Sequence, residues 1–298
     1  MPGPETIRTP DERFQDLPDF PFAPHYLDFE GARLHYLDEG PRDGKVVLCL
    51  HGEPTWCFLY RRMVPVLVEA GYRVVAPDFM GFGRSDKYLR LDDYDCDRHM
   101  RSISRVVEGL DLGDVTPVVQ DWGGLLGLVW AAENEGRVAR LVILNTALAT
   151  GDVNIGLPFR LWRGFARWTP IFPAGRIVKS ALVRPVAPEV IAGYDAPFPA
   201  ERYKAGARAF PRLVPLERDD PFAARGRAAR DVYARWDKPT FLRFGRRDPI
   251  LGRAGPYFLK LVKALRGQEM VWIEDAGHFV QEDAGPELAR DVVRFLAG

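Results

Sequence analysis

The chain has 298 residues, with 41 basic and 41 acidic side chains, so its formal net charge is zero. A chain without net charge has no overall field that attracts nucleic acid or an anionic membrane, which favours a small, weakly charged ligand. Residues 1–22 lack the apolar core of a secretion signal, and no segment approaches the roughly 18 apolar residues that span a bilayer. The three cysteines lack C-x-x-C spacing, which argues against a zinc site and favours a cytoplasmic location.

Short apolar runs alternate with longer helical patterns from residue 35 onward. This alternation predicts an α/β fold with a mostly parallel sheet and helices on both faces. Buried strands are expected at 45–50, 73–77, 117–120 and 140–144, after an antiparallel strand at 34–37. Helices are expected at 61–70, 97–109 and 124–134.

The alternation stops between residues 149 and 229, where helical pieces are broken by repeated prolines. Such an aromatic-rich insertion predicts a helical cap over the edge of the sheet. Strands at 239–244 and 269–273 then resume the pattern, and a helix at 286–296 ends it. We therefore predict a core in two parts, residues 1–148 and 230–298, with a cap formed by residues 149–229.

The run VVQDWGG at 118–124 places a carboxylate where a strand turns sharply into a helix. A turn of this kind presents one side chain at the crest of the sheet. An aspartate at that point, here Asp121, can attack carbon directly and form an ester, whereas a serine attacks an acyl group. The alternative is that Asp121 only caps the following helix.

Polar loops follow four of the predicted strands, at 51–56, 121, 245–249 and 275–279. Catalytic groups of such sheets gather beyond the carboxyl ends of the strands. Asp248 lies in the third loop and His278 in the fourth, so the chain order is nucleophile, acid and histidine. We expect His278 to be a base oriented by Asp248, unless it is only a structural loop histidine. His51 is expected to brace its loop.

These loops carry motifs that resemble those of the haloalkane dehalogenases. The motifs are HGEPTW at 51–56, VVQDWGG at 118–124, FGRRDPILG at 244–252, DAGHFVQE at 275–282 and, in the cap, YDAPFP at 194–199. The resemblance implies the α/β-hydrolase fold, with a mostly parallel eight-stranded sheet and an inserted helical cap. It also implies that Asp121, Asp248 and His278 hydrolyse a small haloalkane without a cofactor or metal, releasing halide. We expect a monomer.

A halide that leaves carbon needs preorganised N–H donors in a dry pocket. Indole N–H groups suit this role because they donate without carrying charge. Trp122, beside the nucleophile, is one candidate halide donor, and the resemblance implies that Trp162 in the cap is the second. Trp168 remains a rival for that place, and either cap tryptophan could instead fill the core.

In the second step His278 would take a proton from the water that attacks the Asp121 ester. We expect the backbone N–H groups of Glu53 and Trp122 to form the oxyanion hole. The resemblance suggests that the Glu53 side chain also positions water; the alternative is an ordinary surface carboxylate.

The nearest alternative function is that of an epoxide hydrolase, which shares the aspartate nucleophile but needs phenols in the cap. Tyr194 and Tyr203 are candidates for those phenols. HGEPTW and the tryptophan pair favour halide instead, because they offer N–H donors to an anion. A dehalogenase of the fluoroacetate type would need arginine where Trp122 stands, and a ligand receptor would not need all three catalytic groups.

Overall fold

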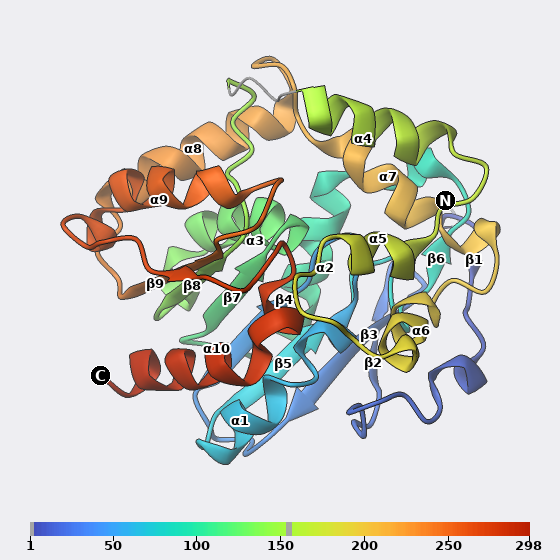
Figure 1. The fold of residues 1–298 in the computed structure, drawn as a ribbon, viewed down its shortest axis with the longest axis horizontal. Helices are drawn as coiled ribbons and strands as arrows, with labels where there is room; N and C mark the ends of the chain where they lie inside the picture. The colour runs from blue at the N-terminus through green and yellow to red at the C-terminus, as the bar shows by residue number, and fades with distance from the viewer. Residues whose placement is uncertain (1–2, 153–156) are drawn as a thin grey trace.

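The computed structural model describes residues 3–152 and 157–298 and has an eight-stranded sheet at its centre (Figure 1). The strand order is β10-β9-β8-β7-β4-β5-β3-β2. Strands β2 and β3 are antiparallel to their neighbours, and the other six run parallel, which confirms the predicted sheet. The strands are β2 (His25–Phe29), β3 (Ala32–Glu39), β4 (Val46–Leu50), β5 (Arg73–Pro77), β7 (Thr116–Gln120), β8 (Leu141–Leu144), β9 (Thr240–Gly245) and β10 (Trp272–Ile273).

The central strands are buried along their whole length, as their mostly apolar sequences predict. Every residue of β4, β5, β7 and β8 is buried. A strand covered on both faces gains from apolar side chains at every position, so it does not alternate with polar ones. The prediction for β10 was too long, because this edge strand pairs only with the end of β9 and is half-buried.

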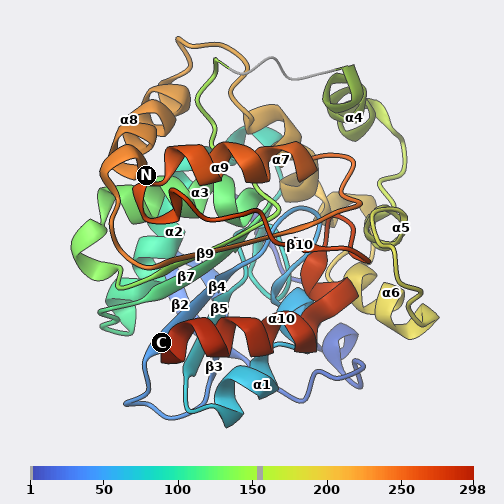
Figure 2. The same cartoon turned by 60° about the vertical axis from the view of Figure 1, so that its left-hand side comes forward.

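Helices cover both faces of the sheet (Figures 1 and 2). One face carries α1 (Val64–Glu69) and α10 (Val280–Ala297), and the other carries α2 (Cys96–Gly109), α3 (Trp122–Glu133), α8 (Pro221–Arg235) and α9 (Gly255–Leu261). The last helix begins at Val280, before the predicted start at Pro286. Proline fits inside it because the backbone is kinked at Ala284, where φ is −136°.

Four helices gather at one side of the sheet in both views (Figures 1 and 2). They are α4 (Leu157–Trp168), α5 (Ala174–Ser180), α6 (Pro188–Asp195) and α7 (Ala205–Leu213). All four lie within the predicted cap, whereas α8 runs across its predicted end at residue 229 and packs against α3.

The remaining elements are short. Strands β1 (Thr6–Ile7) and β6 (Lys87–Tyr88) form a separate antiparallel pair. Single 3-10 turns lie at Asp11–Phe14, Cys57–Tyr60, Leu91–Asp93, Glu135–Arg137, Glu201–Tyr203, Gly252–Ala254 and Lys263–Leu265. None of the helices in the described residues is long and apolar enough to cross a membrane.

Candidate active site

Asp121 stands at the sharp turn between β7 and α3. Its φ is 50° and its ψ is −123°, a region that residues other than glycine rarely adopt and that is typical of a strained functional turn. Its carbonyl accepts the N–H groups of Gly124 at 2.9 Å and Leu125 at 3.0 Å, which starts the helix. The Asp121 side chain makes no capping hydrogen bond to α3, so the capping interpretation was wrong.

Two glycines let the backbone pack closely around this turn. A Cβ atom at Gly52 would lie 2.4 Å from the Cβ atom of Asp121, and one at Gly123 would lie 2.0 Å from the carbonyl oxygen of Leu50. Neither position has room for a side chain. The turn can therefore press against the end of β4 only because these residues are glycines.

The Asp121 carboxylate lies between a backbone donor and a histidine. Its Oδ1 accepts the N–H of Glu53 at 2.7 Å, and its Oδ2 lies 3.4 Å from Nε2 of His278. The Glu53 N–H is thus directed at the carboxyl group, as expected for an oxyanion donor. The backbone N–H of Trp122 follows Asp121 directly, and its part in the oxyanion hole stays a prediction.

Asp248 binds His278 on the side of the ring that faces away from Asp121, and both side chains are buried. Nδ1 of His278 lies 3.0 Å from Oδ2 of Asp248, whose Oδ1 accepts the N–H groups of Ile250 at 2.8 Å and Leu251 at 3.1 Å. A carboxylate at Nδ1 favours a proton on that nitrogen and leaves Nε2 to face Asp121. The structure therefore brings the three predicted catalytic residues together in the predicted order.

Nearby charges outweigh burial in setting the pKa values of His278 and Asp248. Burial disfavours the charged imidazole of His278, but the Asp248 carboxylate and the contact with Asp121 outweigh it and raise the pKa of His278 to about 10. Burial also works against ionisation of Asp248, yet His278 and the two backbone N–H groups lower the pKa of that carboxyl. The charged forms of His278 and Asp248 therefore stabilise each other.

Asn145 is a site residue that the sequence analysis missed. Its Nδ2 donates to Oδ2 of Asp248 at 2.7 Å and to the carbonyl of Gly277 at 2.9 Å, and its Oδ1 accepts the N–H of Gly245 at 2.8 Å. It therefore ties the acid loop to the histidine loop. The available signal was its position directly after β8, at the edge of the sheet where the other site residues lie.

Gln120 is a second residue that was missed. It is the fully buried last residue of β7, and its Nε2 lies 3.3 Å from Nε2 of His278 and 3.2 Å from the His278 carbonyl. A polar side chain at the end of an otherwise apolar strand was the signal. Its amide supports the imidazole on the side that faces Asp121.

The Glu53 side chain is buried rather than on the surface, so the surface alternative was wrong. It is 6% exposed, and its Oε1 has no hydrogen-bond partner among the described residues. Burial and the nearby charge of Asp121 raise the pKa of Glu53 well above its usual range. The raised pKa favours the neutral carboxyl form of Glu53 beside Asp121.

The tryptophans differ in their burial. Trp122 is 4% exposed and stacks on Phe210 of α7, with ring centroids 4.4 Å apart. Trp162 is half-buried and packs on Phe172, with centroids 5.9 Å apart, whereas Trp168 is 74% exposed. Exposure makes Trp168 unsuitable for a dry halide site. Within the described part of the chain no ring contact joins Trp162 to Trp122, so its assignment stays a prediction.

Of the two candidate cap tyrosines, Tyr194 has its hydroxyl bound to another side chain. The Tyr194 hydroxyl donates to Oε2 of Glu282 at 2.5 Å, and Glu282 also forms a two-pronged ion pair with Arg61 at 2.6 and 2.8 Å. Tyr203 is buried, and the guanidinium of Arg202 lies 5.4 Å from its ring centroid. Tyr194 is thus committed to a buried ionic network.

His51 braces its loop, as predicted. Its Nδ1 lies 2.8 Å from the carbonyl oxygen of Gly52, and its Nε2 accepts the N–H of Phe79 at 3.0 Å. Both ring nitrogens are therefore occupied. Burial lowers the pKa of His51, which keeps the ring neutral.

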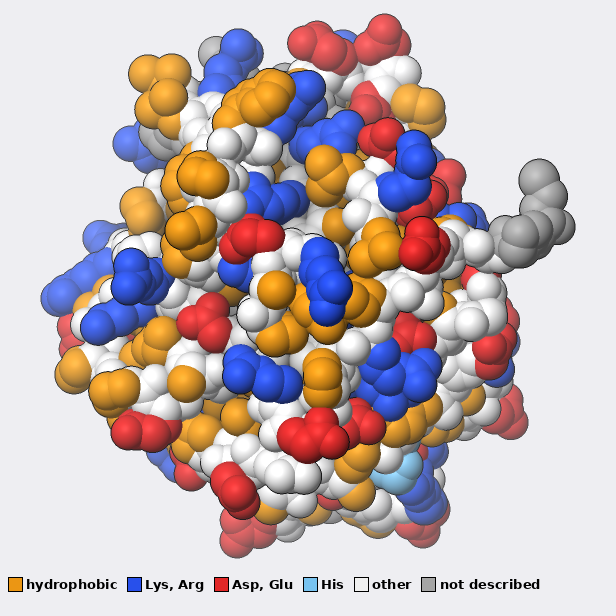
Figure 3. Space-filling view, turned by 90° about the vertical axis from the view of Figure 1, so that its right-hand side faces the viewer, with side chains coloured by type: hydrophobic (Ala, Val, Ile, Leu, Met, Phe, Trp, Pro, Cys, Tyr) orange, Lys and Arg blue, Asp and Glu red, His pale blue; other side chains and the backbone are white. Residues whose placement is uncertain are grey.

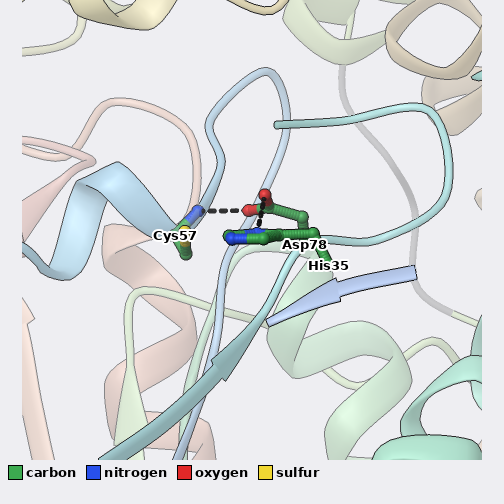
Figure 4. Close-up of side chains that lie close together, drawn as sticks. All are labelled: His35, Cys57 and Asp78. Atoms are coloured by element: carbon green, nitrogen blue, oxygen red, sulfur yellow. Dashed lines mark hydrogen bonds and ion pairs between the residues drawn. The ribbon is translucent and has the colours of Figure 1, made fainter. Parts of the chain in front are cut away.

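His35, Cys57 and Asp78 form a second buried cluster, with possible ligand atoms within 4.8 Å of one another (Figure 4). The Asp78 carboxylate already accepts the N–H groups of Cys57 and Arg84, both at 2.8 Å, and lies 2.7 Å from Nδ1 of His35. Its oxygens thus hold the turn after β5 against the loop after β4. We assign this cluster a structural role rather than that of a metal site.

Comparison with known proteins agrees with this geometry. Residues 45–285 match the alpha/beta hydrolase fold family. The chain is 51% identical over 294 residues to a haloalkane dehalogenase of Mycobacterium marinum, covering 97% of this chain and 99% of the relative. It is 52% identical over 290 residues to haloalkane dehalogenase 1 of Mycobacterium tuberculosis, covering 96% of each.

A solved structure gives the same result. The tetrameric haloalkane dehalogenase DpaA from Paraglaciecola agarilytica NO2 matches with a TM-score of 0.91 and 39% identity, covering 96% of this chain and 97% of that one. Sequence and fold therefore agree over nearly the full length, and the chain belongs to the haloalkane dehalogenases within the α/β-hydrolase fold family.

Proposed function

We propose that the protein hydrolyses the carbon–halogen bond of small haloalkanes through an alkyl ester on Asp121, giving alcohol, halide and a proton. The observation that carries the proposal is the position of the Asp121 carboxylate at the strained turn. It lies 2.7 Å from the N–H of Glu53 and 3.4 Å from Nε2 of His278, and Asp248 supports the histidine from behind.

In the first step an Asp121 carboxylate oxygen attacks the carbon that bears the halogen. A C–O ester bond forms, the carbon–halogen bond breaks, and the halogen leaves with the bonding electrons as halide. Trp122 and Trp162 would donate their indole N–H groups to that anion. Support for the pair comes from packing: α4, which carries Trp162, packs on α7, whose Phe210 stacks on Trp122.

In the second step His278 takes a proton from water, and the resulting hydroxide oxygen bonds to the carbonyl carbon of the Asp121 ester. The oxyanion is held by the N–H groups of Glu53 and Trp122. The bond between the carbonyl carbon and the alkoxy oxygen then breaks, and the alkoxide takes the proton from His278 and leaves as the alcohol. Asp121 is left as a carboxylic acid that carries the oxygen of the water, and loss of its proton to solvent regenerates the carboxylate. Asp121 loses its charge when it becomes an ester, which removes one cause of the raised pKa of His278 and prepares it to act as a base.

The alternative as an epoxide hydrolase is less well supported. That reaction needs a phenol free to protonate an alkoxide, and the Tyr194 hydroxyl is already bonded to Glu282. The indole beside Asp121 suits a leaving anion better.

A small-molecule substrate also fits the surface, because acidic and basic side chains are interspersed over the face in Figure 3.

The activity is tested by halide release from a panel of chloro-, bromo- and iodoalkanes, with an epoxide as a control. We expect halide and alcohol in equal amounts from the haloalkanes. Asp121→Ala is the matched inactive variant. Turnover of the epoxide without any halide release would instead assign the chain to the alternative function.

The oligomeric state is a separate part of the proposal. We expect a monomer, but the solved relative is tetrameric and α4 exposes Leu157, Leu161, Phe165 and Trp168. Size-exclusion chromatography with light scattering, at several protein concentrations, tests this expectation. A mass that stays above 33.7 kDa on dilution would refute it.

A further inference from the structure

Asp283 is a buried carboxylate at the start of α10 that has no part in the mechanism above. It is 1% exposed, and its two oxygens accept three backbone N–H groups. Gly277 donates to Oδ2 at 2.7 Å, Arg184 donates to Oδ1 at 2.8 Å, and Val183 donates to Oδ1 at 3.1 Å and Oδ2 at 3.2 Å. One side chain thus joins the loop that carries His278 to the cap segment between α5 and α6.

The same two segments also touch directly. The backbone N–H of His278 donates to the carbonyl of Ala181 at 2.9 Å. A Cβ atom at Gly277 would lie 2.3 Å from that carbonyl oxygen, so the histidine loop lies flat against the cap backbone. The position of the catalytic imidazole therefore depends on where residues 181–184 of the cap are held.

The neighbouring residue anchors Asp283 itself. Glu282 is buried in its ion pair with Arg61 and accepts the hydroxyl of Tyr194 from α6. A buried ion pair with several hydrogen bonds has little freedom to move. The first turn of α10 is therefore fixed to both the core and the cap, and Asp283 presents its oxygens from a rigid base.

We propose that Asp283 is a positioning residue for His278, acting through the backbone of Gly277 and of cap residues 181–184. The inference rests on the proposed function, in which His278 is needed to hydrolyse the ester but not to form it. Asp121 is held separately, by the N–H of Glu53 and by its own turn. Loss of Asp283 should therefore slow hydrolysis and spare alkylation.

Asp283→Asn is the sharpest substitution because it keeps the shape of the side chain. Both Asp283 oxygens face only N–H donors, so the amide nitrogen of asparagine would meet a donor instead of offering an acceptor. A catalytic group displaced by about 1 Å can lose on the order of 100-fold in rate. We expect hydrolysis to slow by at least about tenfold and alkylation to change by less than about twofold.

The two rates are separated by rapid acid quench with enzyme in excess over a bromoalkane. Bromide formation reports alkylation, and alcohol formation reports hydrolysis. Glu287→Gln is the control, because Glu287 lies on the same helix and pairs with Arg184 at 3.1 Å, but on the exposed surface. We expect the Asp283 variant to accumulate an alkyl adduct by intact mass spectrometry, and the control to behave as wild type.

Asp283→Ser, which keeps one acceptor, is measured as well and replaces the asparagine variant if that variant does not fold. Equal loss of both rates, or unchanged hydrolysis in the folded variants, would overturn the positioning role. Failure of the wild type to release bromide would instead refute the proposed function. The two failures are therefore distinguishable.

Discussion

Replacement of His278 by phenylalanine tests the division of labour between the two chemical steps. The carboxylate of Asp121 keeps its hydrogen bond from Glu53 at 2.7 Å, so it remains in place to attack carbon. Asp248 loses Nδ1 of His278 but keeps the donors of Asn145, Ile250 and Leu251, so the acid loop is still held. We expect alkylation to continue in this variant and ester hydrolysis to stop.

The size of the effect follows from the loss of the base. General-base catalysis contributes about 10²–10⁴-fold, which raises the barrier to hydrolysis by about 3–5 kcal/mol. A bromoalkane should then release about one equivalent of bromide per active site, after which the variant stalls with the alkyl group on Asp121. Intact mass spectrometry should find the added mass, and digestion should place it on the peptide that contains residues 120–122.

The control for this experiment is Asp121→Ala, which should show neither bromide release nor adduct. Steady turnover in the His278→Phe variant would refute the assignment of the base. An adduct on any other residue would refute the assignment of the nucleophile.

Three further predictions concern the halide donors, the pH dependence of hydrolysis and the pH dependence of stability. Trp122→Phe and Trp162→Phe should each raise the barrier to carbon–halogen cleavage by about 3 kcal/mol, which slows it roughly 100-fold, and should weaken the quenching of tryptophan fluorescence by halide. Trp168→Phe should change neither the rate nor the quenching much, because Trp168 is exposed. Quenching that survives Trp162→Phe but disappears in Trp168→Phe would contradict this assignment. The rate of hydrolysis should fall at acid pH with an apparent pKa above about 6.5, because Asp248 still favours the cation of His278 in the ester intermediate. A rate that does not fall down to about pH 4 would exclude His278 as the base. In the free enzyme the His278 pKa is raised to about 10, so its contribution to stability is complete below about pH 6.5 and is lost as pH rises through about 10. The difference in unfolding free energy between wild type and His278→Gln should therefore shrink as pH rises from about 6.5 to about 10.

The sequence alone was sufficient for the parts of the site that depend on local order along the chain. The apolar runs 45–50 and 117–120 are long and uniform enough to be recognised as buried strands. Parallel strands end at one edge, so polar residues that follow them, such as Asp121 and His278, can be assigned to the same site before their distance is known. The tight turn at Asp121 was also predictable, because Gly123 and Gly124 come directly after Trp122, the residue that follows it.

Only the tertiary structure decided which polar groups meet. Asn145 and Gln120 looked like ordinary strand ends, and they become site residues because β7, β8 and β9 lie side by side and bring them to Asp248 and His278. The role of Asp283 depends on cap backbone about 100 residues earlier in the chain. Hydrogen bonds of this kind depend on the strand order and on how the cap docks on the core, and neither can be predicted from the spacing of residues along the chain. The local sequence pattern therefore determined which types of catalytic residue are present, and long-range packing determined the distances between them.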